Sequence, residues 1–350
     1  MKVGIITLAG RFNYGNRLQN YATTRIYERL GFEVESVCLD DHRTLRAIKK
    51  KVSSLVGHAR KDPEELMTLE RLAAFDRFNR LMNTRSVSSS RAVGLDRYDY
   101  FSAGSDQIWN PNYMRHREGW FFLKFARPEQ RIALAPSVGV DSLDKFQAIR
   151  LKWGVRGFAS LSVREQKGAD LIEACSGRRA EVLCDPTLVL PVDEWHAVSD
   201  SRLTPDAPYV MTYLLGGVGH DAGVVLDRVT DRHRLQVVSL SDRQRENEPD
   251  AGPAEFIDLI ENAVHVVTDS FHAAVFASIA ETPLTIVRRE GGASMFSRLE
   301  QLAGTLGIEQ KIYGASSFDF AQAANFEGVS EAIENERAKF MEYLEACLSA

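Results

Sequence analysis

The N-terminal part of the chain alternates apolar runs with an amphipathic segment, and this order leaves few folds open. Residues 3–8 form a continuous apolar run of strand length, residues 16–30 repeat apolar side chains at helical spacing, and residues 33–39 form a second apolar run. Gly31 follows the helical segment, at the position where glycine commonly ends a helix. A strand, a helix and a second strand in this order predict parallel strands joined by a crossover helix. We therefore expect an α/β protein built on parallel sheets.

The same alternation continues along most of the chain and predicts two domains. Apolar runs predict later strands at residues 98–103, 131–135, 158–163, 181–184, 209–215, 235–240, 264–268 and 283–288. Because 350 residues exceed one ordinary hydrophobic core, two domains are expected. The polar, proline-bearing residues 191–207 predict a linker between an N-terminal α/β domain, 1–190, and a second one, 208–328. We expect the final helix, 329–350, to return to the first domain.

Composition and charge exclude several classes of function. The net charge of −5 provides no overall basic field for nucleic acid. The four cysteines are far apart and have no metal-ligand spacing, so we expect neither a metal site nor a disulfide framework, which fits a reducing cytoplasm. No apolar run reaches the roughly 18 residues of a membrane span. The N-terminal apolar run is interpreted as a strand rather than a signal peptide.

Residues 43–60 predict an amphipathic helix whose polar face is basic. Its apolar side chains fall on one side, and six lysines and arginines lie opposite. Such a helix could lie peripherally on the anionic inner face of a membrane, or could pack on the sheet as an ordinary surface helix. Residues 63–83 predict a further helix.

Polar and glycine-bearing residues follow several of the predicted strands. These strand ends read Gly104-Ser105-Asp106-Gln107-Ile108-Trp109, Arg164-Glu165, Asp185-Pro186-Thr187 and Asp269-Ser270. In open α/β sheets, ligands bind outside the carboxyl ends of the strands, where such loops gather. We therefore expect these segments to form one site. Trp109 could stack on a sugar ring there, or could pack in the core.

His272 follows the strand at 264–268, at the start of a helix of small residues. A helix N-terminus attracts anions, and a histidine there can shuttle protons near neutral pH. His272 could equally cap the helix or pack at a domain seam. The residues alone leave both interpretations open.

Five segments, in order along the chain, carry a resemblance to a known family. They are Asn13-Tyr14-Gly15-Asn16 with Gln19, Gly104-Ser105-Asp106-Gln107-Ile108-Trp109, Ser162-Val163-Arg164-Glu165, Asp185-Pro186-Thr187, and Thr268-Asp269-Ser270-Phe271-His272 with Ser297-Arg298-Leu299. Within residues 3–310, the chain resembles the polysaccharide pyruvyl transferase family. The resemblance implies two Rossmann-like domains facing a cleft, as in GT-B glycosyltransferases. It also implies transfer of pyruvate from phosphoenolpyruvate, as co-substrate, to a sugar of a cell-surface polysaccharide or its lipid-linked precursor, with no other cofactor and no metal.

The resemblance also implies roles for individual residues. His272 is expected to act as general acid and base, and Asp106 to activate an acceptor hydroxyl. The donor side comprises Arg164, Arg288, Arg298 and Ser270, of which Arg288 is assigned by its position alone. The acceptor side comprises Asn13, Tyr14, Asn16, Gln19, Ser105, Gln107 and Trp109.

Several of these residues also have a purely structural interpretation. Arg164 could form a structural ion pair, Arg298 could be a surface residue of a helix, and Asn16 could cap a helix. Asp106 could hold its own loop through backbone N–H groups, and Asp185 has the same ambiguity.

One position departs from the family pattern. Characterised members carry arginine two residues before the catalytic histidine, where this chain has Ser270. Loss of that cation should weaken donor binding by about 1–3 kcal/mol unless Arg288, Arg289 or Arg298 replaces it. Two alternatives therefore stay open: a glycosyltransferase that uses a nucleotide sugar on the same fold, and a non-catalytic glycan-binding protein.

Overall fold

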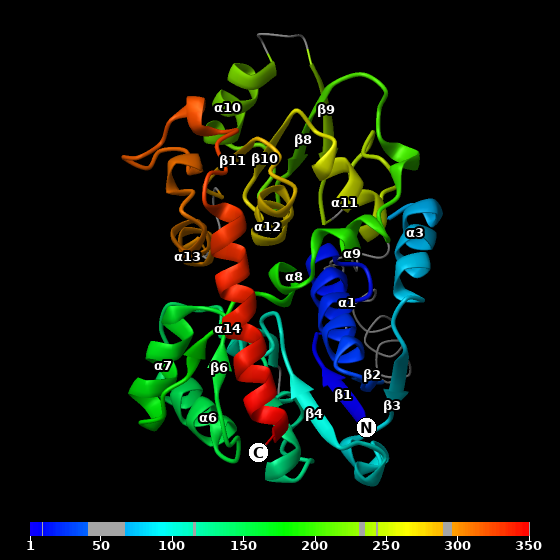
Figure 1. The fold of residues 1–350 in the computed structure, drawn as a ribbon, viewed down its shortest axis with the longest axis vertical. Coiled ribbons are helices and arrows are strands. Elements are labelled where there is room, and N and C mark those ends of the chain that lie inside the picture. Colours follow the sequence, from blue (N-terminus) through cyan, green and yellow to red (C-terminus); the bar gives the residue numbers. More distant parts are fainter. Residues whose placement is uncertain are drawn as a thin grey trace, which may run out of the picture.

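The structure is a computed structural model, which describes residues 1–8, 10–40, 67–114, 117–230, 235–242, 244–289 and 296–349. Two lobes, each built on a parallel sheet, lie end to end, and a long C-terminal helix runs along both (Figure 1). The basic segment 43–60 lies outside the described residues, so its helix and its membrane contact stay predictions.

The N-terminal lobe holds a five-stranded parallel sheet in the order β3-β2-β1-β4-β5. Its strands are β1 (Lys2–Ile6), β2 (Glu33–Leu39), β3 (Thr84–Val87), β4 (Tyr100–Ala103) and β5 (Arg131–Ala133). The central β1 is buried along nearly its whole length, because helices cover both faces of a parallel sheet. The expected strand-helix-strand opening is confirmed: α1 (Tyr14–Arg29) crosses from β1 to β2, and the two strands pair in parallel.

The edge strand β3 differs from the sequence prediction. The sequence predicts one helix over residues 63–83, whereas the described α3 spans Leu69–Asn79 and the chain then enters β3. Three of the four side chains of β3 are wholly or partly exposed, because it is an edge strand. The strand therefore has no apolar run by which the sequence could reveal it.

A short parallel pair lies beside this sheet. β6 (Ser162–Val163) and β7 (Glu181–Val182) pair with each other and are accompanied by α6 (Lys145–Val155) and α7 (Gln166–Ser176). The backbone N–H of Arg164 donates to the carbonyl of Pro136, which joins the end of β6 to the loop after β5. The residues that follow β5, β6 and β7 therefore reach the same region.

The C-terminal lobe holds a four-stranded parallel sheet in the order β11-β10-β8-β9. Its strands, β8 (Tyr209–Tyr213), β9 (Gln236–Leu240), β10 (His265–Thr268) and β11 (Leu284–Ile286), lie within the predicted apolar runs. They alternate with α10 (His220–Thr230), α11 (Pro253–Glu261), α12 (Phe271–Ile279) and α13 (Ser297–Leu306). The start of α12 faces the N-terminal lobe (Figure 1).

The connection between the lobes is packed rather than loose. It includes the short helices α8 (Pro186–Val189) and α9 (Val192–His196). Trp195 of α9 is 1% exposed and packs against Tyr21 of α1 and Phe276 of α12. The largest hydrophobic cluster accordingly contains residues of both lobes.

The last helix, α14 (Val329–Ser349), runs from the C-terminal lobe back to the N-terminal sheet (Figure 1). The Tyr343 hydroxyl donates to the carbonyl of Ala133 in β5 at 2.9 Å, and the Tyr100 hydroxyl of β4 donates to the carbonyl of Leu348 at 2.9 Å. Although α14 has 21 residues, no helix among the described residues is apolar enough at such a length to cross a membrane.

Candidate active site between the lobes

His272 is the second residue of α12 and lies where the two lobes meet. Its side chain is 11% exposed, and α1 of the N-terminal lobe packs against it. A Cβ atom added at Gly15 of α1 would lie 2.3 Å from His272 Nδ1, which is too close for any side chain. Glycine is therefore required at this contact, where the helix backbone approaches the imidazole directly.

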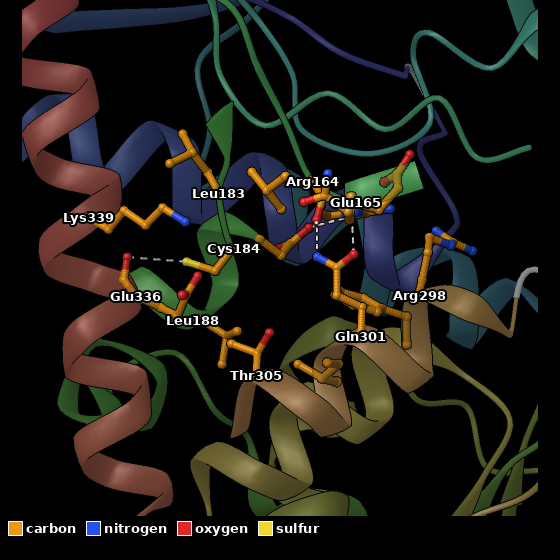
Figure 2. Close-up of a pocket in the computed structure, with 15 residues that line it drawn as sticks. Arg164, Glu165, Leu183, Cys184, Leu188, Arg298, Gln301, Thr305, Glu336 and Lys339 are labelled. Atoms are coloured by element: carbon orange, nitrogen blue, oxygen red, sulfur yellow. Dashed lines mark hydrogen bonds and ion pairs between the residues drawn. The ribbon is translucent and has the colours of Figure 1, made fainter. Parts of the chain in front are cut away.

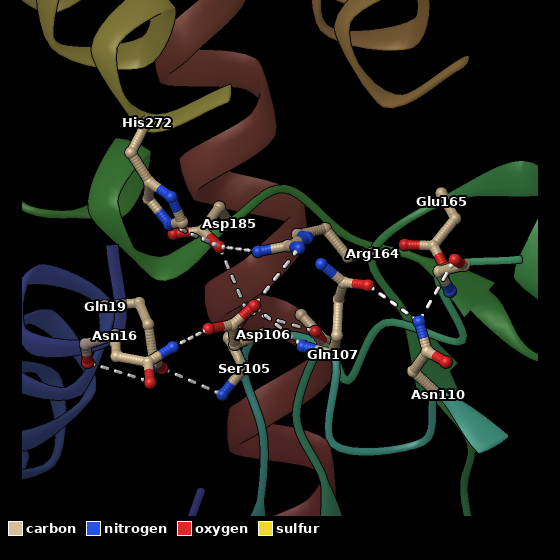
Figure 3. Close-up of polar contacts among 12 residues, drawn as sticks. Asn16, Gln19, Ser105, Asp106, Gln107, Asn110, Arg164, Glu165, Asp185 and His272 are labelled. Atoms are coloured by element: carbon tan, nitrogen blue, oxygen red, sulfur yellow. Dashed lines mark hydrogen bonds and ion pairs between the residues drawn. The ribbon is translucent and has the colours of Figure 1, made fainter. Parts of the chain in front are cut away.

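Asp185 lies at the centre of a polar cluster beside the histidine (Figure 3). Its Oδ2 accepts hydrogen bonds from Arg164 Nη1 at 2.6 Å and from the Ser105 hydroxyl at 3.1 Å, and His272 Nε2 is 3.8 Å away. Its Oδ1 accepts hydrogen bonds from the N–H and the hydroxyl of Thr187, so Asp185 also caps the N-terminus of α8. One carboxylate thus connects segments from both lobes.

The electrostatics of the cluster keep Asp185 ionised. Burial would raise the pKa of this carboxyl, but Arg164 and His272 outweigh burial and hold the pKa at about 2. Burial would likewise lower the pKa of Arg164, but Asp185 and Asp106 outweigh it and raise that pKa. The pair is therefore charged at neutral pH.

Arg164 retains hydrogen-bonding capacity that the protein does not use. It is 4% exposed, and its guanidinium carbon lies 4.8 Å from the centre of the Phe271 ring. Its Nη2 is 3.8 Å from Asp106 Oδ1, and within the described part of the chain neither Nε nor Nη2 has a hydrogen-bond partner. Buried donors of this kind are costly unless something pairs with them, which is what an anionic ligand would do.

Arg298, the second residue of α13, approaches the same ring from the C-terminal lobe. Its guanidinium carbon lies 6.0 Å from the Phe271 ring centre. Burial, and then the neighbouring Arg164, lower the pKa of Arg298 to about 10. The buried Arg164 and the partly buried Arg298 therefore lie near one aromatic ring, and an anion between the two cations would stabilise this arrangement.

A cavity of about 280 Å³ lies beside the two arginines (Figure 2). Its wall includes Arg164, Glu165, Phe271, Arg298, Gln301 and Lys339. Gln301 of α13 donates to the Arg164 carbonyl at 3.1 Å and accepts from the N–H of Gln166 at 2.8 Å, which fixes α13 against the N-terminal lobe. The cavity thus lies at the junction of the two lobes and α14.

Burial sets the protonation state of His272. Burial lowers the pKa of His272 below the ordinary 6.5; Asp185 opposes this effect and Arg164 adds to it. The imidazole is therefore neutral at neutral pH. Its Nε2 is buried and has no hydrogen-bond partner among the described residues, although Asp185 Oδ2 lies 3.8 Å away.

Asp106 and Asn16 extend the cluster toward α1. Asp106 adopts a left-handed backbone with φ of 62°, and its Oδ1 accepts from the N–H of Gln107 at 2.8 Å. Its Oδ2 accepts a hydrogen bond from Asn16 Nδ2. Asp106 therefore holds its own loop through a backbone N–H and also faces Arg164, while its role toward an acceptor hydroxyl stays a prediction.

Other predicted acceptor residues support this framework. Gln19 is fully buried, and its side chain bonds the Thr7 hydroxyl and the N–H of Ser105. Asn13 caps α1 by accepting from the N–H of Asn16, so the cap that the sequence suggested for Asn16 belongs to Asn13.

Two more predicted residues also make contacts within the protein. Gln107 is 8% exposed and accepts from Asn110 Nδ2 at 2.8 Å. Ser270 precedes α12, is 4% exposed, and donates its backbone N–H to the Thr268 hydroxyl at 3.0 Å.

Three predicted site residues are corrected by the structure. Trp109 is fully buried, lies between Phe122 and Phe158, and has no face left for a sugar ring. Tyr14 is also fully buried, stacked on aromatic rings of the C-terminal lobe. Arg288 belongs to a surface ion pair: its side chain is 52% exposed and pairs with Glu300 at 2.8 Å.

Two central residues were not among the predicted site residues. The signal for Asp185 is its position directly after a strand, but its contacts with Arg164 and His272 join segments that are far apart in sequence. Phe271 appears in the sequence only as a neighbour of His272. Among the described residues, no group of three His, Cys, Asp or Glu side chains could hold a metal ion.

A model of the polysaccharide pyruvyl transferase family matches residues 13–290. This span is well over half of the 350 residues and contains the cluster around Asp185. The chain belongs to the polysaccharide pyruvyl transferase family, as the five sequence segments indicated, and is therefore a transferase. No curated protein sequence matches it significantly.

Solved structures agree with the fold at low sequence identity. The S. aureus MnaA-UDP co-structure superimposes with a TM-score of 0.50 and 11% identity, covering 96% of this chain and 89% of that one. The UDP-GlcNAc 2-epimerase from Neisseria meningitidis bound to UDP-GlcNAc gives a TM-score of 0.47 and 10% identity, over 99% of this chain and 100% of that one. The fold is thus GT-B-like, with two Rossmann-like lobes facing a cleft.

Proposed function

We propose that the protein transfers pyruvate from phosphoenolpyruvate to a sugar of a cell-surface polysaccharide or of its lipid-linked precursor. Family membership supports pyruvyl transfer in general. The observation that supports the donor is a pair of cations, the buried Arg164 and the partly buried Arg298, near Phe271 at the wall of the cavity. Phosphoenolpyruvate carries a carboxylate and a phosphate, and two guanidiniums can bind both groups bidentately.

Arg298 is our candidate for the cation that Ser270 does not supply. It reaches the Phe271 ring from α13, whereas Arg288 pairs with Glu300 at the surface. The pKa of Arg298 is lowered to about 10 by burial and then by charge repulsion from Arg164. A bound dianion would relieve this repulsion, and we expect it to raise that pKa.

The proposed reaction needs one proton transfer to carbon. A proton is added to the methylene carbon of the donor, which makes the central carbon cationic. A sugar hydroxyl attacks that carbon and releases its proton, and the bond to phosphate breaks. Attack by a second hydroxyl completes a ketal, so the products are the ketal and inorganic phosphate.

His272 is the residue we assign to these proton transfers. An anionic donor bound beside it would raise the pKa of His272, because a nearby negative charge favours the imidazolium. The protonated ring delivers its proton to the donor carbon. The neutral ring that remains then accepts the proton of the attacking hydroxyl at Nε2.

The decisive experiment measures phosphate release from phosphoenolpyruvate across a panel of glycan acceptors. We expect release only when an acceptor is present. His272→Gln should lower turnover by about 10²-fold or more while leaving thermal stabilisation by phosphoenolpyruvate intact. Arg298→Gln should instead abolish that stabilisation, and Arg288→Gln is the matched control because its side chain is exposed and paired elsewhere.

Two outcomes would overturn the proposal. Folded wild-type protein that releases no phosphate with any acceptor, and is not stabilised by phosphoenolpyruvate, would exclude this donor. Stabilisation by a nucleotide sugar in its place would support the glycosyltransferase alternative, and a His272→Gln variant with full turnover would exclude the assigned mechanism.

A further inference from the structure

Helix α6 exposes three large apolar side chains on its outer side. Phe146 is 76% exposed, Ile149 is 64% exposed and Trp153 is 47% exposed. Their spacing of three and four residues places them on one side of the helix, and we call them the apolar stripe. Exposed large apolar groups are common singly, but three aligned on one helix mark an interaction surface.

The opposite side of α6 shows that the orientation of this helix is fixed. Leu151 and Val155 are buried, and a Cβ atom at Gly154 would lie 2.5 Å from the Phe122 ring. Asp144 caps the helix through the N–H groups of Phe146 and Gln147. The helix lies on the outer side of the N-terminal lobe, beside α7 (Figure 1). The apolar stripe is therefore presented outward by a close-packed helix rather than exposed by a loose one.

The charged residues around the stripe on this helix are all basic. They form a set that we call the basic flank: Lys145, Arg150, Lys152 and Arg156, all exposed. Residues 145–164 contain no aspartate or glutamate, although the whole chain carries a net charge of −5. Glu118 pairs with Arg150 at 3.1 Å, Asp144 caps the helix, and Asp141 is exposed before its start. The neighbouring α7 carries Asp170 and Glu173, of which Asp170 accepts from Gln166 and Glu173 pairs with Arg179.

Trp153 has a cation directly on its ring. Lys124 Nζ lies 4.8 Å from the Trp153 ring centre and donates to the carbonyl of Arg156. An amphipathic indole with basic neighbours is the side-chain combination that prefers the interface between lipid headgroups and acyl chains.

We propose that α6 is a docking helix for an anionic phospholipid surface, with the apolar stripe entering the headgroup boundary and the basic flank contacting lipid phosphates. Such helices lie in the plane of the interface, with apolar side chains inserted by about 5–10 Å. Binding then has two contributions: anionic lipids attract the basic flank, and the apolar stripe supplies the hydrophobic contribution. The proposal rests on α6 alone and does not depend on the reaction that the protein catalyses.

Charge favours a membrane over a second copy of this chain. A symmetric dimer through α6 would place the basic flank against its own copy, and like charges facing each other oppose association. The cores of protein interfaces are also depleted in lysine, whereas the membrane-facing side of an amphipathic helix is typically bordered by it.

The test is co-sedimentation with vesicles, read together with tryptophan fluorescence. Vesicles of phosphatidylcholine and phosphatidylglycerol are compared with pure phosphatidylcholine, at low and at high salt. Of the four tryptophans, Trp109, Trp120 and Trp195 are at most 5% exposed, so a change on binding reports Trp153. We expect sedimentation with the anionic vesicles at low salt, partial release by high salt, and quenching of Trp153 by spin-labelled lipid.

Variants separate the two components of the surface. The combined change Phe146→Ser, Ile149→Ser and Trp153→Ser should weaken vesicle binding by about tenfold or more. The combined change Lys145→Glu, Lys152→Glu and Arg156→Glu should abolish the preference for anionic vesicles. The matched control, Leu69→Ser with Val224→Ser, removes exposed apolar side chains from α3 and α10 and should bind like the wild type.

The proposal is overturned if wild-type protein does not sediment with anionic vesicles, or if the serine variant of the stripe sediments like the wild type. Sedimentation velocity without vesicles tests the alternative occupant, a second copy of this chain. A dimer that the serine variant disrupts, in a protein that ignores vesicles, would assign this face to a second copy.

Discussion

Two buried arginines connect the lobes in the same chemical way but in different surroundings. Arg71 of α3 is fully buried, lies 5.3 Å from the Tyr14 ring centre, pairs with Glu248 at 3.5 Å, and donates to the Ser241 carbonyl. Arg164 lies 4.8 Å from the Phe271 ring centre and pairs with Asp185 at 2.6 Å. Each guanidinium thus has one aromatic ring and a carboxylate from a distant segment.

The difference lies in what surrounds each guanidinium. Arg71 borders an aromatic seam in which Tyr14 packs against Phe256 and Tyr213 across the lobes. Arg164 has a second, partly buried cation near its ring, Arg298, and it lines the cavity, of whose wall Arg71 is not a part. A buried arginine with a carboxylate partner is therefore not in itself a sign of a ligand site. The paired cations and the adjoining cavity are what distinguish the two regions.

The largest expected effect comes from removing each guanidinium in turn. Arg164→Met and Arg71→Met should each destabilise the fold by about 3–5 kcal/mol, because each leaves a buried carboxylate without its partner. Only Arg164→Met should also abolish thermal stabilisation by phosphoenolpyruvate. Chemical denaturation, with and without the ligand, measures both quantities.

Conservative variants keep this prediction testable if the methionine variants do not fold. Arg164→Lys retains the charge but loses the fork of donors, so it should fold and bind the donor more weakly. If the Arg71 variants lost the ligand response as completely as the Arg164 variants, the distinction between the regions would fail.

A smaller effect is expected at the glycine that contacts the histidine. Gly15→Ala places a methyl group 2.3 Å from the present position of His272 Nδ1, so the ring or α1 must move, at about 1–3 kcal/mol. Turnover should fall more than donor affinity does. Gly223→Ala in α10 is the matched control, since a Cβ atom there meets nothing within 4 Å, and it should be neutral or slightly stabilising. Equal losses in both variants would contradict the contact.

Asp185→Asn tests how the cluster sets the charge of the histidine. Asp185 raises the pKa of His272 against the effect of burial, so its loss should lower that pKa further. The acidic limb of the pH profile should then move to lower pH, and an NMR titration of the imidazole should show the same shift. Thr187→Val removes a cap bond but keeps the charge, so it should cost stability and leave the titration in place. An unmoved titration in Asp185→Asn would refute the coupling.

The smallest effect is the dependence of stability on pH. The folded pKa of His272 lies below 6.5, the value expected for the unfolded chain, so protonation favours unfolding. The contribution of His272 to the stability of the fold is fully present above the pKa of the unfolded chain, and it is lost as the pH falls toward the pKa of the folded protein. The stability of the wild type relative to His272→Gln should therefore decrease from neutral pH to about pH 5. Denaturation midpoints for the two proteins across this range provide the measurement.

The sequence predicted the fold more completely than it predicted the site. Apolar runs locate buried strands such as β1 and β10, because burial on both faces requires apolar side chains throughout. The edge strand β3 escapes this rule, since most of its side chains are at least partly exposed. Helix α6 was not predicted from the sequence either, because apolar side chains on both its buried and its exposed sides leave no one-sided apolar pattern.

For the site, the order of the motifs indicated which segments meet, but not which side chains face one another. Arg288 and Arg298 are both plausible donor ligands in sequence, yet only Arg298 lies near the Phe271 ring. Trp109 is a residue type that stacks on sugar rings, but here it is fully buried and packs against Phe122. The direction of a side chain depends on packing between distant segments, which residue spacing does not encode.

Helix α14 has a consequence for how substrates enter. Its residues Glu336 and Lys339 form part of the cavity wall, Arg337 donates to the carbonyl of Val189 at 2.7 Å, and Tyr343 is anchored to β5. Helix α14 thus contacts α13 of the C-terminal lobe as well as α8 and β5, so a wide hinge motion would have to break these contacts together. We expect substrates to enter through small shifts of α13 against α14. The contacts of α14 would then limit how far the mouth of the cavity can widen.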